Sequence, residues 1–279
     1  MYKNQEIHFN VYPHTPLDFG DIPTNVTHLT FVDPFNQALH PGLIPEGVTC
    51  IIMNDEFNQP LTQGSFPSTL KSLTFGKKFN HKLFASDIPG YLEELTFGKH
   101  FNKKIKLYHA ASLRSITFGN DYNQSLLGPS LPHSLSSLTF GKSFNQPLRK
   151  EYLYNSVKHV KFGDDFNQPI YKGALPYNLV SLSFGKSFNH QLFPENLPSS
   201  LTLLCFGKEF NHPVTKEGIL PKQLQCVTFG ENFGQMGNGE MLQGSFNIHF
   251  KNPNIKWETY SYNPNIQIVV GNTIVKACI

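Results

Sequence analysis

Cysteine, tryptophan and unbalanced charge are all scarce in this sequence of 279 residues. Its four cysteines form neither a CxxC pair nor a dense disulfide framework, which favours a reducing compartment. A net charge of only +3 gives no global reason to expect nucleic acid or a membrane surface as a partner. The first residues lack the apolar run of a signal peptide, and no segment approaches a membrane-spanning helix. The sequence therefore predicts a cytoplasmic protein that is not secreted and does not enter membranes.

One short phrase recurs along most of the chain. It centres on a Phe-Asn step, or Tyr-Asn in one copy, and successive copies lie about 22 residues apart. The asparagines of these steps are Asn36, Asn58, Asn80, Asn102, Asn123, Asn145, Asn167, Asn189 and Asn211. A fixed period of this length indicates stacked repeats, in which each unit contacts its neighbours. We predict one elongated domain with ten repeats over residues 22–242, an N-terminal cap over 1–21 and a C-terminal cap over 243–279.

Each repeat contains a segment in which apolar and polar residues alternate, such as Leu73-Thr74-Phe75. This pattern predicts a short strand whose Leu and Phe point inward. The fold class we expect is therefore mainly β, a curved solenoid of the leucine-rich-repeat kind with one parallel strand per 22-residue coil. A glycine follows most strands, where an unusual backbone angle or a close approach is cheapest for Gly. Prolines recur before the next strand and predict extended or 3₁₀ structure on the convex side.

The repeated Asn and Phe predict a scaffold role. A coil that turns away from its strand leaves backbone polar groups that need partners, and an Asn side chain offers both donors and an acceptor. We expect the Asn column to form an interior ladder between coils. Two Phe columns should stack beside it, because coils about 4.8 Å apart suit offset aromatic packing.

The repeat pattern also carries a family resemblance. LxxLxF followed by Asn resembles the leucine-rich repeat, although the Asn falls two positions later than usual. More narrowly, Phe57-Asn58-Gln59-Pro60-Leu61, with Ile44-Pro45, is similar to the FNIP (IP22) repeat family of giant viruses and social amoebae. The resemblance implies a solenoid used for macromolecular recognition. For a viral chain it implies a virus–host interaction in the host cytoplasm.

The chain ends should cover the open edges of the sheet. Residues 266–270 and 273–277 surround Gly271-Asn272 and predict a β-hairpin with a two-residue turn. Trp257, the only tryptophan, should close the core beneath it. An edge left uncovered could pair with a second copy, so a homodimer through one end of the solenoid is a further hypothesis.

Strand residues that alternate with the buried Leu and Phe must face outward and form columns on the sheet. The small polar residues of these columns are Ser72, Thr74, Thr96, Ser115, Thr117, Ser137, Thr139, Ser181 and Ser183. Beside them runs a line of lysines, here called the Lys rim, formed by Lys77, Lys99, Lys142, Lys186 and Lys208. We predict a non-enzymatic scaffold that binds a protein partner on these columns and the Lys rim. A line of like charges favours an acidic partner.

Two other function classes remain open. The Ser-x-Thr pairs form a regular hydroxyl lattice that could bind glycans or ice, although Glu94 and Lys161 interrupt it. A polysaccharide-active enzyme would need clustered carboxylates, and Glu93 and Glu94 point to opposite faces. His190 and His212 fall one coil apart, yet two histidines alone do not define a metal site. The sequence therefore predicts no catalytic residue, no metal ligand and no cofactor.

Overall fold

The computed structural model describes residues 6–12, 16–126, 130–214, 216, 218–233, 247–250, 268–270 and 273–276. The chain divides into two compact units, Met1–Ser136 and Ser137–Ile279. Their boundary falls inside the run of repeats. This division does not mark the ends of the repeats, so the cap boundaries near residues 21 and 242 remain predictions.

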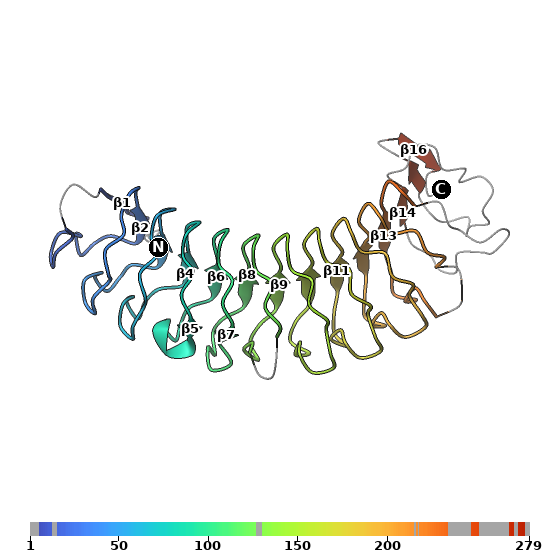
Figure 1. Cartoon of the computed structure of the whole chain (residues 1–279), viewed down its shortest axis with the longest axis horizontal. Coiled ribbons are helices and arrows are strands. Elements are labelled where there is room, and N and C mark those ends of the chain that lie inside the picture. Colours follow the sequence, from blue (N-terminus) through green and yellow to red (C-terminus); the bar gives the residue numbers. More distant parts are fainter. Residues whose placement is uncertain are drawn as a thin grey trace, which may run out of the picture. The chain divides into compact units, whose positions relative to one another are not determined.

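The first unit is a stack of coils that each contribute one strand to a parallel sheet. Its strands pair in the order β1-β2-β3-β4-β6-β8. Their bounds are β1 His8–Val11, β2 His28–Phe31, β3 Cys50–Ile52, β4 Ser72–Thr74, β6 Glu94–Thr96 and β8 Ser115–Thr117. In Figure 1 the strands lie side by side along one edge of the coils. This arrangement confirms the one-strand-per-coil prediction.

The second unit repeats this arrangement. Its strands pair in the order β9-β10-β11-β12-β13-β14-β15-β16, and only the last pair is antiparallel. Their bounds are β9 Ser137–Thr139, β10 His159–Lys161, β11 Ser181–Ser183, β12 Leu203–Cys205, β13 Cys226–Phe229, β14 Asn247–Phe250, β15 Ile268–Val270 and β16 Thr273–Lys276. The β15–β16 pair stands where the sequence predicts a hairpin. Gly271, Asn272 and Trp257 lie outside the described residues.

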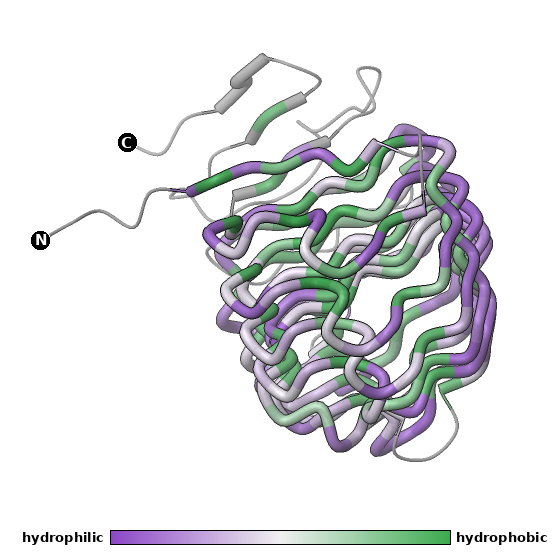
Figure 2. Tube along the Cα trace, turned by 90° about the vertical axis from the view of Figure 1, so that its left-hand side faces the viewer, coloured by the Kyte–Doolittle hydropathy of each residue, from purple (hydrophilic) through white to green (hydrophobic). Residues whose placement is uncertain are grey.

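Two aromatic columns fill the coils. The Phe at the end of most strands stacks on the Phe or Tyr four residues later, with ring centroids 3.8 Å apart for Phe97 and Phe101. The turn that makes this possible is closed by the Phe101 N–H, which donates to the carbonyl of Gly98. Most rings also stack on their copies in neighbouring coils, within the range for offset aromatic pairs. Figure 2 shows that successive coils of a unit carry hydrophobic residues at matching places.

The coils of each unit spread apart with distance from the sheet. Neighbouring strands of a sheet lie about 4.8 Å apart. The strand rings Phe97 and Phe118 have centroids 5.5 Å apart, and the deeper pair Phe101 and Tyr122 has centroids 6.0 Å apart. The corresponding distances in the second unit are 5.5 and 6.1 Å. The sheet is therefore the concave face within each unit.

The glycine that follows most strands allows neighbouring coils to touch. A Cβ placed on Gly98 would lie 1.8 Å from the carbonyl oxygen of Gly76, and one on Gly185 would lie 1.8 Å from that of Gly163. No side chain fits at these distances. Close backbone approach, rather than a positive φ, is the reason for this glycine column.

The side of the coils opposite the sheet consists mainly of turns. The Leu70 N–H donates to the Pro67 carbonyl, and the same proline-centred turn recurs in later coils. A one-turn 3₁₀ helix, η1, covers Ala85–Asp87. Two short strands that the sequence analysis did not predict, β5 Leu83–Phe84 and β7 Ile105–Lys106, form a separate parallel pair on this side (Figure 1).

The Asn column forms a hydrogen-bonded ladder along the coils. The Asn58 N–H donates to Oδ1 of Asn36 at 2.8 Å, and the Asn80 N–H donates to Oδ1 of Asn58 at 3.0 Å. The same bond recurs at Asn102, Asn123, Asn167, Asn189 and Asn211. The expected interior location is wrong, because these side chains are half-buried or exposed. Each follows an inward-pointing Phe or Tyr on an extended segment, so it points outward and bonds along the coil surface.

Candidate functional site: the sheet face

The outward side chains of the strands form a continuous face in each unit, here called the sheet face. Register pairing places Ser72 beside Glu94 and Thr74 beside Thr96, and the columns continue in this way. All nine predicted Ser and Thr residues of these columns are half-buried. Two apolar side chains also face outward, since Ile52 is 46% exposed and Leu203 is 45% exposed.

Hydroxyl groups on the sheet face differ from those on the sides of the coils. Ser134 Oγ donates to the Leu113 carbonyl at 2.7 Å, Ser200 Oγ donates to the Leu179 carbonyl at 2.7 Å, and Thr69 Oγ1 also bonds to a carbonyl. By contrast, eight sheet-face hydroxyls make no hydrogen bond to any described part of the chain. They belong to Thr74, Thr96, Ser115, Thr117, Ser137, Thr139, Ser181 and Ser183. These groups can bond to water or to a partner.

The Lys rim is largely neutralised by acidic residues of its own column. Lys77 pairs with Asp55, Lys186 Nζ lies 2.9 Å from Asp164 Oδ2, and Lys208 pairs with Glu231. The hydrogen bond to Asp55 raises the pKa of Lys77, and the same bond lowers the pKa of Asp55. Among the described residues no carboxylate pairs with Lys99 or Lys142. Two of the five lysines therefore offer a charge that no carboxylate in the described part of the chain compensates.

The histidines one coil apart have a structural role. Nε2 of His190 lies 3.1 Å from the carbonyl oxygen of Asn167, and Nε2 of His212 lies 3.0 Å from that of Asn189. In other coils a Gln side chain makes the same contact, as Gln59 does with the Asn36 carbonyl. These imidazoles therefore belong to the ladder.

The cysteines and carboxylates of the sheet face show no activated group. Burial raises the pKa values of Cys50 and Cys226, which disfavours a reactive thiolate. Cys50, Cys205 and Cys226 are all free, and Cys278 lies outside the described residues. Glu93 pairs with Lys71 beside the sheet, whereas Glu94 on the sheet face accepts a long hydrogen bond from Ser72.

A groove beside the sheet face of the first unit was missed by sequence reasoning. It has a volume of about 740 Å³ and lies at the N-terminal ends of β3, β4, β6 and β8. Its lining residues are Thr49, Thr69, Lys71, Tyr91, Glu93, Ala111, Ser112, Arg114 and Ser134. Tyr91 is 70% exposed. Tyr and Arg residues often contribute much of the binding energy of an interface. Tyr91 and Arg114 do not recur at the matching positions of the neighbouring coils, so they were a usable signal in the sequence.

No described helix has the length and apolar character needed to cross a membrane. The helical content of the described residues is a single short 3₁₀ turn.

Comparisons with known proteins agree with this architecture. Residues 35–78, 111–143, 144–187 and 188–232 match the family model described as FNIP Repeat, and these segments make up more than half of the chain. No curated protein matches the chain.

Among solved structures the chain is similar to CroV588, a giant-virus protein reported as a novel circular leucine-rich-repeat structure. The identity is 28%, the TM-score is 0.60, and the match covers 96% of this chain and 46% of CroV588. The chain thus spans about half the length of that relative.

Two bacterial proteins show weaker similarity. The pneumococcal vaccine antigen PcpA has 15% identity and a TM-score of 0.22, over 96% of this chain and 84% of PcpA. A leucine-rich repeat protein from Bacteroides ovatus has 13% identity and a TM-score of 0.20, over 95% and 71% of the two chains. From its repeats and its match to the family model, the chain belongs to the FNIP repeat family and folds as a parallel solenoid of the leucine-rich-repeat type.

Proposed function

We propose that this chain is a non-catalytic scaffold that binds a protein partner on its sheet face. The observation that carries the proposal is the set of eight half-buried hydroxyls that make no hydrogen bond to the described residues. A partner can satisfy these groups, and the backbone beneath them is held in register by bonds to the coils on either side. Repeat solenoids of the FNIP and leucine-rich-repeat kind are generally non-catalytic, which agrees with a binding role.

The Lys rim contributes through its uncompensated members. An acidic partner would have to compete with Asp55 for Lys77 and with Asp164 for Lys186, whereas Lys99 and Lys142 are accessible without that competition. Exposed ion pairs contribute only about 0–1 kcal/mol each. We therefore place the main binding energy on the sheet face, where apolar groups such as Ile52 accompany the hydroxyls.

The proposal is tested by placing charge on the sheet face. Thr96→Lys with Thr117→Lys introduces two long cations where the native hydroxyls are half-buried, and these cations would block close contact. The matched control is Gln63→Lys with His109→Lys, which adds the same charge at exposed positions outside the strands of the sheet. A partner captured with the native chain is purified, and its affinity is measured for each variant. We expect the sheet-face variant to bind more than about tenfold more weakly and the control to bind normally.

Two further variants locate the edges of the surface. Lys99→Glu with Lys142→Glu should weaken binding of an acidic partner, and Tyr91→Ala tests whether contact extends into the groove of the first unit. Equal affinity of the native chain and the sheet-face variant would reject this surface. The native chain could instead bind glycans on an array or cause thermal hysteresis of its solution. Loss of either activity in the Thr96 and Thr117 variant would support glycan or ice binding by the hydroxyl lattice.

A further inference from the structure

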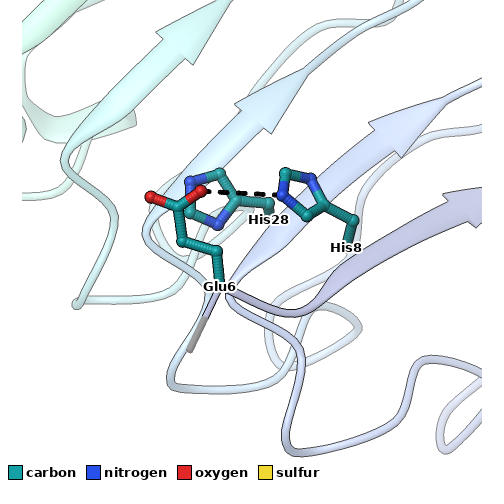
Figure 3. A group of neighbouring side chains, drawn as sticks. All are labelled: Glu6, His8 and His28. Atoms are coloured by element: carbon teal, nitrogen blue, oxygen red, sulfur yellow. Dashed lines mark ion pairs between the residues drawn. The ribbon is translucent and has the colours of Figure 1, made fainter. Parts of the chain in front are cut away.

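Three side chains of types that can bind metal lie together on β1, on β2 and just before β1, as Figure 3 shows. His8 on β1 and His28 on β2 are register partners in adjacent parallel strands, and their ring centroids lie 4.7 Å apart. Glu6 precedes His8 by two residues, so both side chains project from the same side of an extended chain. Oε2 of Glu6 lies 3.6 Å from Nε2 of His8. One ligand atom from each of the three residues lies within 4.8 Å of the others.

The donor types match a recognised zinc ligand set. Two imidazole nitrogens and one carboxylate oxygen form the three-residue set of several catalytic zinc sites. Bonds of about 2.0–2.1 Å in a tetrahedral site put the donors roughly 3.4 Å apart. The Glu6 and His8 donors are already near that spacing. Both side chains are about two-thirds exposed, so a small rotation can bring all three donors into range.

The third ligand is oriented by a neighbouring hydroxyl. Thr27 Oγ1 lies 3.0 Å from Nδ1 of His28 and also accepts a hydrogen bond from the Ile7 N–H at 2.8 Å. This hydroxyl therefore joins the segment that carries Glu6 and His8 to the coil that carries His28. Hydrogen bonds of this kind, made by groups behind a ligand, fix ring orientation and strengthen metal binding.

We propose that Glu6, His8 and His28 form a binding site for a divalent transition metal ion, best suited to Zn²⁺, that fastens β1 to β2. Three protein ligands leave a fourth position for water or for a group from a partner. The site differs from the pair His190 and His212, whose Nε2 atoms contact backbone carbonyls. The sequence analysis missed it because separations of 2 and 20 residues do not follow the 22-residue period.

The test is Zn²⁺ binding to the full chain without a histidine tag, measured by competition with a chromophoric chelator. We expect one site, with affinity reduced more than about tenfold by His28→Gln and by Glu6→Gln. The double variant His190→Gln, His212→Gln removes two imidazoles from adjacent coils, as many as the proposed site contains, and should bind Zn²⁺ like the native chain. Glu6→Gln changes only an exposed side chain, so it remains informative if His28→Gln fails to fold.

A second measurement separates strand fastening from surface adsorption of metal. Zn²⁺ should slow amide hydrogen exchange in β1 of the native chain, because a ligand that binds only the folded strand opposes its opening. The Glu6→Gln variant should lose this protection. Equal Zn²⁺ affinity in the native chain and the Glu6 and His28 variants, or unchanged exchange in β1, would overturn the proposal. Neither result bears on partner binding by the sheet face, which is tested with other residues.

Discussion

The interior columns and the sheet face follow the same 22-residue period, yet they differ in how strictly they repeat. Inside, the ring before the ladder Asn is Phe in nearly every coil, and the residue after the strand-end Phe is nearly always Gly. On the sheet face, successive register partners in the first unit are His28, Cys50, Ser72, Glu94 and Ser115. The interior repeats because each side chain must pack against its own copy. The face varies because its side chains point toward solvent or a partner.

This difference predicts where substitutions are costly. An interior residue contacts the coil before it and the coil after it, so one change disturbs two interfaces of the stack. A residue of the sheet face has a smaller share of such contacts. The comparison can therefore be tested by substituting matched residues inside and outside the columns and comparing the loss of stability.

The largest effect is expected at the glycine column. In Gly98→Ala the new methyl group would lie 1.8 Å from the Gly76 carbonyl oxygen, so the two coils must separate. We expect the free energy of unfolding to fall by more than about 3 kcal/mol, or the variant not to fold. The control is Gly90→Ala in the same unit, where a Cβ would meet nothing within 4 Å. Denaturant unfolding monitored by circular dichroism measures both, and an equal loss in the two variants would contradict the close-approach explanation.

A smaller effect is expected at the Asn ladder. Asn80→Ala removes the oxygen that accepts from the Asn102 N–H at 3.0 Å, and this donor then loses its partner. The expected loss is about 1–2 kcal/mol. Asn80→Asp keeps an acceptor at the same place and should lose less. Asn120→Ala, at an exposed position outside the ladder, should change stability by less than about 0.5 kcal/mol. Equal losses at positions 80 and 120 would show that the ladder hydrogen bond does not stabilise the fold.

The sequence predicted the periodic features well, because a period fixes which residues meet. Within the repeats, the sheet, its register and the stacking of the aromatic rings follow from residues about 22 positions apart. The burial of the Asn column was predicted wrongly, because the neighbouring Phe already occupies the inward direction. The direction in which each side chain projects from an extended segment decides whether it is buried, and the repeat period alone does not reveal that direction.

Features that depart from the period were missed. The β5–β7 pair forms where two adjacent coils have Lys82 and Lys104 at the position of Pro60 in the preceding coil. Proline lacks the N–H that a strand needs, so the run of coils without proline at this position was a readable signal. The Glu6, His8 and His28 cluster was missed because it also departs from the period. It lies where the first strand joins the repeats.

The smallest effect is expected at the exposed ion pair of the Lys rim, and its sign depends on pH. The hydrogen bond from Lys77 lowers the pKa of Asp55, so the ionised carboxyl stabilises the fold at pH values above its unfolded pKa. This contribution should disappear as the pH falls from about 4 through the lower folded pKa. Asp55→Asn should therefore be slightly less stable than the native chain at pH 7, and the two should converge in acid. Urea unfolding across this range measures the difference, and high salt should shrink it at pH 7. A difference that persists unchanged in acid would mean that Asp55 acts by packing, as the interior columns do, and the contrast between interior and surface would weaken at this position.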